Sequence, residues 1–227
     1  MTDVELTVSV PGREPGSIRL VATLVVTAML SGIVLAGAFQ VTKPVIEANR
    51  MRELRAGVFT VVPGATRVRT FTWRDGRLVD AEDDDGASGP VLYAGYDDDS
   101  SFRGWAMVGE GAGFQDTIRV LHGFDPTQWR VTGMHILLSR ETPGLGDKIF
   151  KDADWVASFD ALAVEPPITV VRDGRDEAHE VDAITGATIS SQAVVKIINE
   201  ANAAWLPRLP PPGAEPALER DASGDTP

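Results

Sequence analysis

The sequence predicts an α+β protein in which a single N-terminal transmembrane helix is followed by a mostly antiparallel sheet with flanking helices. Three observations support this prediction. An uncharged apolar stretch of about 22 residues lies near the N-terminus and is long enough to span a bilayer. The middle of the chain alternates apolar and polar residues between glycines, as in strands joined by turns. A run of small residues near the C-terminus leads into an amphipathic helix.

The first 41 residues contain the predicted membrane anchor. Residues 1–19 are polar and interrupted by Pro and Gly, so we expect a short flexible arm, and residues 20–41 form the predicted transmembrane helix. A cleaved signal peptide is the alternative, because Ala36-Gly37-Ala38 resembles a cleavage site, although the apolar stretch is longer than in most signal peptides. More Lys and Arg residues follow this helix than precede it. The positive-inside rule alone therefore places the following domain in the cytoplasm.

Residues 42–65 predict a helical stalk between the anchor and the domain. Pro44 suits the first turn of a helix, and the apolar residues after it can form one face. Residues 68–78 then alternate around Asp75-Gly76, a pattern typical of a tight β-hairpin. The sheet is therefore expected to begin directly after the stalk.

Further strands are predicted at residues 105–108, 117–121 and 130–138. Glycines expected at their turns or bulges are Gly104, Gly109, Gly111, Gly113 and Gly133. Phe114 is expected in the core, because aromatic side chains in strands are mostly core residues, although contact with a ligand is the alternative. A short helix at 154–159 and a strand at 168–171 follow. The Pro-rich and acidic residues 207–227 predict a disordered tail.

Two acidic runs, at residues 83–85 and 97–99, raise the question of a calcium loop. Neither run has the alternating acidic spacing and the distal Glu that such a loop requires. We interpret both runs as solvated loops.

Two segments in the second half of the chain are candidates for a site. Residues 141–148 read Glu-Thr-Pro-Gly-Leu-Gly-Asp-Lys, and their Pro and Gly predict an ordered loop after a strand. Residues 180–184 predict another strand, after which Thr185-Gly186-Ala187-Thr188 turns into a helix. The unpaired amides and the positive dipole at the start of a helix favour a phosphate. Alternatively, the hydroxyl residues here only cap the helix. The candidate caps are Thr185, Ser190 and Ser191.

Composition excludes several functions. A net charge of −12, from 33 acidic and 21 basic residues, argues against nucleic acid as a partner. The chain contains no Cys, which excludes thiolate catalysis and Cys-ligated iron–sulfur clusters. Its three His residues are scattered without a metal-binding pattern, so no metal site is expected. If the chain carries electrons, it requires an organic cofactor.

The two segments together carry a family resemblance. Asp182-x-x-Thr185-Gly186-Ala187-Thr188 resembles the flavinylation motif of the FMN-binding domains in RnfG, a component of the Rnf complex, and in NqrC, a component of the sodium-pumping NADH:quinone oxidoreductase. The segment that begins at Glu141 is similar to the ETPGLG loop of the same family. The resemblance extends from the anchor to the final helix and implies an FMN-binding domain at residues 66–206.

The resemblance also implies roles for individual residues. Thr188 would carry FMN covalently through a phosphoester, installed by a flavin transferase of the ApbE type that uses FAD as donor. The transferase would recognise Asp182 and the Gly-Ala-Thr that ends the motif. No catalytic residue is implied. The cofactor-binding residues implied are Thr142, Gly144, Leu145, Gly146, Thr185, Gly186 and Ala187.

For the whole protein, the resemblance implies an electron-transfer subunit of an Rnf-type complex that couples electron flow between NADH and ferredoxin to ion translocation. Its partners would be the Rnf subunits A, B, C, D and E and membrane lipid. Its domain would lie on the periplasmic side of the bacterial inner membrane, in conflict with the charge pattern. The NqrC component of a sodium-pumping NADH:quinone oxidoreductase is an alternative. A membrane-anchored binding or sensory module without a redox role is another.

Overall fold

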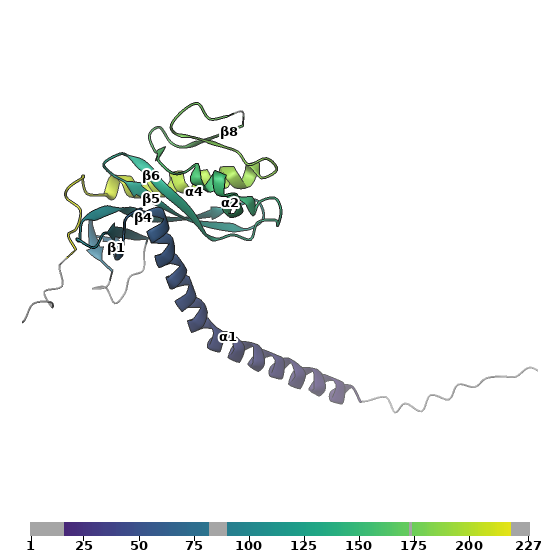
Figure 1. Ribbon diagram of the computed structural model, residues 1–227. Helices are drawn as coiled ribbons and strands as arrows, with labels where there is room; N and C mark the ends of the chain where they lie inside the picture. Colours follow the sequence, from purple (N-terminus) through teal and green to yellow (C-terminus); the bar gives the residue numbers. More distant parts are fainter. Residues whose placement is uncertain (1–15, 82–89, 173, 219–227) are drawn as a thin grey trace, which may run out of the picture. The chain divides into compact units, whose positions relative to one another are not determined.

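The computed structural model describes residues 16–81, 90–172 and 174–218 (Figure 1). The chain forms two compact units that divide after Arg50. Most of the predicted N-terminal arm and the acidic run at 83–85 lie outside the described residues. The predicted fold class is confirmed, because a long apolar helix precedes a sheet domain with flanking helices.

Helix α1 covers Ser17–Val61, a length of 45 residues. Its most apolar 18-residue window has a mean hydropathy of 2.3 and no buried residue, so it is long and apolar enough to cross a membrane. The prediction for Pro44 was wrong, because this residue lies inside the helix rather than in its first turn. The helix continues through this point, where Thr42 Oγ1 donates to the carbonyl oxygen of Ala38 at 2.7 Å.

The main sheet has seven strands, all antiparallel, in the order β2-β1-β3-β4-β5-β6-β7. Their bounds are β1 Arg67–Arg74, β2 Arg77–Asp80, β3 Val91–Tyr96, β4 Phe102–Ala112, β5 Thr117–Asp125, β6 Arg130–Leu138 and β7 Leu162–Ala163. Two short strands, β8 Thr169–Val171 and β9 Glu180–Asp182, pair in parallel as a separate sheet. The remaining helices are α2 Lys148–Lys151, α3 Ala153–Ala157, α4 Thr188–Trp205 and the 3₁₀ helix η1 Leu206–Arg208.

The predicted hairpin is confirmed between β1 and β2. Arg74 pairs with Arg77 across a two-residue turn, and the turn residues Asp75 and Gly76 have φ values of 49° and 80°. Positive φ at both positions gives the turn a twist that matches the twist of the strands, and Asp-Gly tolerates it.

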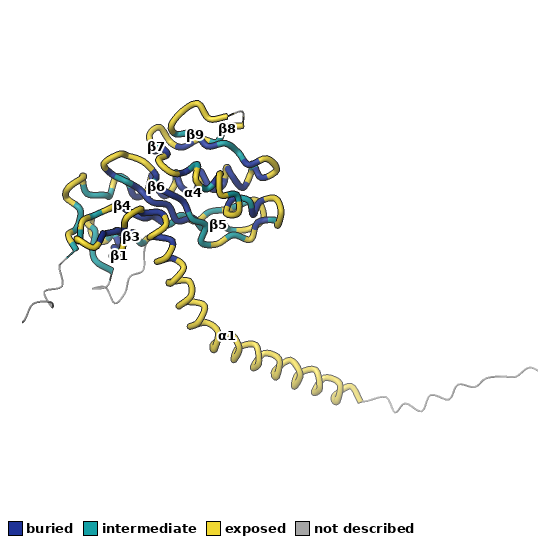
Figure 2. Tube along the Cα trace, in the orientation of Figure 1, coloured by how far each residue is buried: buried dark blue, intermediate teal, exposed yellow. Residues whose placement is uncertain are grey.

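The sheet has a core on each face, because successive side chains of a strand point to opposite sides. On one face, the last turns of α1 bury Leu54, Val58 and Val61 against β3, β4 and β5. On the other face, α4 covers the central strands and completes the larger core, which includes Trp105 and Met107 of β4. Figure 2 shows buried residues along the central strands and along parts of α4.

Two of the predicted turn glycines have a different role. Gly109 and Gly111 lie inside β4 rather than at a turn or bulge, and both face α4. A Cβ atom at Gly109 would lie 2.6 Å from Cγ2 of Ile197, and one at Gly111 would lie 2.7 Å from its Cγ1. These glycines therefore let the helix approach the strand closely. Gly104 and Gly133 do adjoin register shifts, and Gly113 lies in the turn between β4 and β5.

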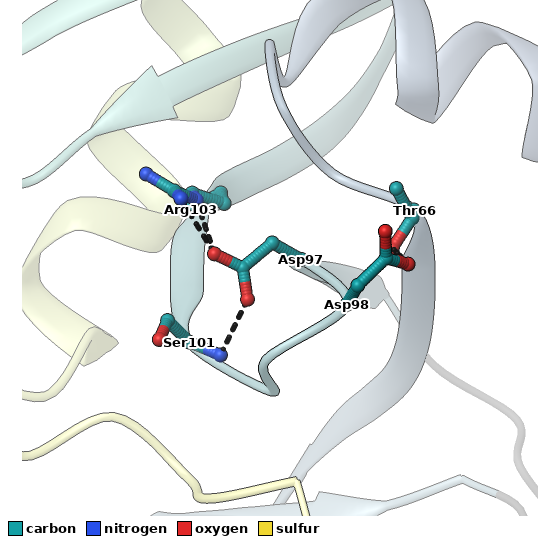
Figure 3. Close-up of polar contacts among 5 residues, drawn as sticks. All are labelled: Thr66, Asp97, Asp98, Ser101 and Arg103. Atoms are coloured by element: carbon teal, nitrogen blue, oxygen red, sulfur yellow. Dashed lines mark hydrogen bonds and ion pairs between the residues drawn. The ribbon is translucent and has the colours of Figure 1, made fainter.

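The run at residues 97–99 is a loop between β3 and β4, but it is not fully solvated. Asp97 is buried and accepts from the backbone N–H of Ser101 at 2.8 Å and from the Arg103 guanidinium at 2.5 Å (Figure 3). These contacts, chiefly the Ser101 hydrogen bond, hold the pKa of Asp97 below its usual value. Asp98 accepts from Thr66 at 2.8 Å. The interpretation as a solvated loop was therefore wrong for Asp97, because its carboxylate fastens the turn.

The segment 207–218 differs from the predicted disordered tail. Tyr96 donates its hydroxyl to the carbonyl oxygen of Pro216, and Arg69 donates to that of Ala217 at 2.9 Å. Leu209 and Leu218 pack against the larger core. The segment is ordered because its few apolar side chains and its carbonyls find partners on the sheet, which composition does not reveal.

Substituting Gly109 by Ala should destabilise the domain. The added methyl would overlap Ile197, and overpacking a close contact costs about 1–3 kcal/mol. Urea unfolding of the full chain in detergent measures the loss. Gly32→Ala is the control, because a Cβ there meets nothing within 4 Å. Equal stability of the two variants would contradict the close packing of α4 on β4.

Stability should also depend on pH through His122. Complete burial of its ring lowers its pKa from 6.5 to about 4, despite a hydrogen bond with Asn202 at 2.8 Å. The folded state favours the neutral ring. The free energy of unfolding is therefore highest above about pH 6.5 and falls by about 3 kcal/mol as the pH approaches 4. Thermal unfolding of the full chain between about pH 7 and pH 4.5 measures this loss. His122→Gln should flatten the profile, and an unchanged slope would contradict the assignment.

Candidate functional site

The turn before α4 leaves the first amides of this helix open. Gly186 adopts a φ of 83°, and the N–H of Ala187 donates to the carbonyl oxygen of Ile184 at 2.9 Å. The helix then begins at Thr188 with Ala187 as its N-cap, and no side chain caps it. Among the described residues, the backbone N–H groups of Thr188, Ile189 and Ser190 donate to no hydrogen-bond acceptor. Such amides are ready donors to an anion.

The alternative interpretation of the hydroxyl residues as N-caps was wrong. Ser190 donates its hydroxyl to Glu141 at 2.6 Å. Ser191 accepts from the N–H of Ile184 at 3.1 Å and donates to the carbonyl oxygen of Ala187 at 3.0 Å. Both hydroxyls therefore fasten the turn to its surroundings instead of occupying the helix amides.

The loop that begins at Glu141 is ordered by its own acidic residue. The N–H of Gly144, whose φ is 81°, donates to Oδ1 of Asp147 at 2.8 Å, and Lys151 contacts Oδ2 at 2.6 Å. The Lys151 hydrogen bond is the main reason that the pKa of Asp147 lies below its usual value. Leu145 is thereby held at the tip of the loop, with its side chain half exposed.

Glu141 joins three segments of the site. Its Oε1 accepts from the N–H of Gln115 at 3.0 Å, and its Oε2 accepts from Ser190. The carboxylate thus connects the turn between β4 and β5, its own loop and the first turn of α4. Gly113 and Gly146 make room for it, because a Cβ on either would lie 2.4 Å or 2.7 Å from its oxygens.

These three segments enclose a cavity of about 340 Å³, a size typical of small-ligand sites. Three of its apolar side chains are exposed although they are large: Phe114 by 64%, Leu145 by 50% and Ile189 by 54%. The prediction that Phe114 is core was wrong, because the β4–β5 turn carries its ring to the rim of the cavity. The cavity is lined by Phe114, Thr142, Leu145, Gly146, Gly186, Ala187, Thr188, Ile189 and Ser190.

Most of the predicted cofactor-binding residues meet at this cavity. Gly144 and Thr185 lie next to it in sequence but do not line it. Sequence reasoning missed Ile189 and Ser190, whose proximity to Thr188 was the available signal. No group of three His, Cys, Asp or Glu side chains suitable for a metal occurs in the described part of the chain.

Asp182 lies at the end of β9 and also outside the cavity. Its carboxylate accepts from the N–H of Gly174 at 3.1 Å, and its carbonyl oxygen accepts from Nε1 of Trp155 at 2.8 Å. Binding of backbone amides, one of the usual roles of Asp, therefore occurs here. Its recognition by a flavin transferase stays a prediction.

The cavity fits a ligand that combines a planar apolar ring with a phosphate. Exposed apolar side chains supply ring contacts, open helix amides supply phosphate donors, and the Thr188 hydroxyl lies at the first position of the helix. FMN has these features. Residues 113–203, which include every residue of the cavity, match the model of the FMN-binding domain family.

Relatives of the chain extend this classification. The G component of the ion-translocating oxidoreductase complex of Cereibacter sphaeroides is 31% identical over 83% of this chain and 85% of its own length. The protein of the same name from Methanosarcina acetivorans is 27% identical over 81% of this chain and 91% of its own. The chain belongs to this RnfG family and contains an FMN-binding domain.

A solved structure is also similar. The C component of the Na(+)-translocating NADH-quinone reductase from Parabacteroides distasonis has a TM-score of 0.49 and 20% identity, covering 63% of this chain and 77% of that one. Similarity at this level supports no conclusion about function.

Substituting Glu141 by Gln should weaken the link between the three segments. The variant keeps the shape of the side chain but loses the charge that strengthens two hydrogen bonds, so a loss of about 1–3 kcal/mol is expected. Urea unfolding of the full chain at neutral pH tests this expectation. Glu110→Gln is the control, because this carboxylate is exposed and its Arg119 partner is 3.8 Å away. Equal stability of both variants would rule out the linking role of Glu141.

Proposed function

We propose that the protein is the electron-transfer component RnfG of a membrane-bound Rnf-type complex and that FMN is attached covalently to Thr188 through a phosphoester. One observation carries this proposal. The Thr188 hydroxyl stands where the open amides of α4 meet an apolar cavity in an FMN-binding domain. A phosphate bonded at this hydroxyl can accept from the amides while the ring occupies the cavity.

Attachment is a transfer of the FMN part of FAD to Thr188. Thr188 Oγ1 forms a bond to the phosphorus on the flavin side, the phosphoanhydride bond breaks, and AMP leaves. The hydroxyl proton must pass to a base, since a hydroxyl is a weak nucleophile at neutral pH. The motif itself contains no His or Lys, so a separate flavin transferase of the ApbE type supplies this chemistry. The transferase recognises the motif through Asp182, Gly186, Ala187 and Thr188.

The chain's own residues position the cofactor and shape its surroundings. Phe114, Leu145 and Ile189 provide the apolar surface for the ring, and the loop glycines allow the backbone to approach it. The electron chemistry belongs to FMN, which accepts and releases electrons one or two at a time. Thr142 keeps the loop beside the β4–β5 turn, because its hydroxyl donates to Oε1 of Gln115 at 2.9 Å.

The helix α1 and the family support a setting in a membrane. α1 anchors the chain in the membrane by a single span, and we place the domain on the periplasmic side of a bacterial inner membrane, with Rnf subunits A, B, C, D and E as partners. The complex would couple electron flow between NADH and ferredoxin to ion translocation. The names of the relatives support RnfG over the NqrC component of the sodium-pumping oxidoreductase.

Coexpression with a flavin transferase tests the proposal. The full chain should gain the mass of one FMN less water, and the denatured band should fluoresce. Thr188→Ala should abolish both signals, because the attacking oxygen is gone, and Thr188→Ser should keep them. Thr169→Ala is the matched control, since Thr169 is exposed on β8, lies outside the motif and should leave loading intact.

Two results would contradict the proposal. Loading of Thr188→Ala would move the attachment to another residue. A colourless wild-type chain, made beside a transferase that loads a control protein, would favour the membrane-anchored binding module.

A further inference from the structure

We propose that Lys148 binds the phosphate of the Thr188-linked flavin. This inference rests on the proposed function and assigns a role to a residue that the resemblance leaves without one. Lys148 directly follows the glycine-containing part of the loop that begins at Glu141 and is the first residue of α2.

The position of Lys148 brings its charge to the turn that precedes α4, next to the residues that line the cavity. Its Nζ lies 3.4 Å from the carbonyl oxygen of Thr185, the first residue of the turn that ends at Thr188. Its side chain therefore reaches across from the loop to the segment that precedes the open amides. A long hydrogen bond to one carbonyl leaves the ammonium with donors to spare, since it has three.

The charge of Lys148 is not neutralised by a neighbour in the described part of the chain. The nearest acidic residue in sequence, Asp147, is occupied by Lys151 at 2.6 Å and by the N–H of Gly144. No carboxylate lies within ion-pair distance of Lys148 itself in the same described residues. The two lysines of α2 therefore differ, because Lys151 fastens the loop and Lys148 faces the turn with an unbalanced positive charge.

A cation on the turn that precedes open amides suits a phosphate. The amides of Thr188, Ile189 and Ser190 supply neutral donors, and the helix dipole adds a partial positive charge. A phosphodiester at Thr188 would keep one negative charge, which Lys148 can meet by rotating about its flexible stem. Because the ammonium is only partly buried, we expect about five- to tenfold in affinity from this contact.

A comparison of the binding of two flavins isolates the contact between Lys148 and the phosphate. The full chain carrying Thr188→Val, purified in detergent, cannot form the phosphoester but keeps the cavity. Binding of FMN and of riboflavin is measured by quenching of flavin fluorescence. Riboflavin shares the ring and lacks the phosphate, so the ratio of the two affinities reports the phosphate contacts alone.

Adding Lys148→Gln should lower the affinity for FMN about five- to tenfold and leave the affinity for riboflavin unchanged. Lys196→Gln is the charge-matched control on α4. Its ammonium is exposed and pairs with Glu200 at 3.8 Å, so neither affinity should change. Equal losses for both flavins would show that Lys148 only shapes the cavity, and an unchanged FMN affinity would exclude the contact.

A second measurement applies if neither flavin binds without the covalent bond. Phosphorus NMR of the flavinylated wild-type chain should give one phosphodiester resonance. Lys148→Gln should move this resonance, and Lys196→Gln should not. The same resonance in all three proteins would overturn the role of Lys148 while leaving the phosphoester intact. Absence of any covalent flavin in the wild-type chain would instead overturn the proposed function.

Discussion

The close approach of α4 to β4 is the constraint on which the site depends. Gly109 and Gly111 present no side chains, so Ile197 of the helix fits directly against the strand backbone. This contact fixes the height and direction of an 18-residue helix over the sheet. The N-terminus of α4 is fixed in turn, because a helix is stiff. Thr188 is therefore positioned by packing that lies about two and a half turns away from it.

A buried carboxylate then joins the helix to the loops. Glu141 receives hydrogen bonds from Gln115 and Ser190, and no cation is among its contacts in the described residues. Burying a charge in this way is costly unless its oxygens are satisfied, so the residue stabilises only one arrangement of the three segments. The interaction therefore specifies how the three segments are arranged, and its loss is expected to lower the stability of that arrangement. Only when the three segments are arranged in this way do the exposed apolar side chains at the rim face one cavity.

Local signals in the sequence predicted much of this fold. The Asp75-Gly76 hairpin, the strand at residues 130–138 and the motif around Thr188 each depend on neighbouring residues, and periodicity or turn chemistry reveals such features. Long-range contacts were not predictable in this way. Gly109 resembled a turn glycine until its partner helix was placed against it. Phe114 resembled a core residue because the sequence does not tell which way a turn carries a ring. The ordered segment at 207–218 likewise depends on partners more than 100 residues away.

The geometry of the cavity offers a physical reason for a covalent cofactor. Three of its large apolar side chains, Phe114, Leu145 and Ile189, remain 50–64% exposed, so the cavity leaves part of a bound ring open to solvent. Burial of apolar area is the main source of affinity for a planar ring, and a cavity that is open to solvent provides less of it. The proposed covalent bond at Thr188 would make ring binding intramolecular, which would raise the effective concentration of the ring without any further contact. The ring could then stay partly exposed, which would allow the close approach of a second redox centre that the proposed electron transfer requires.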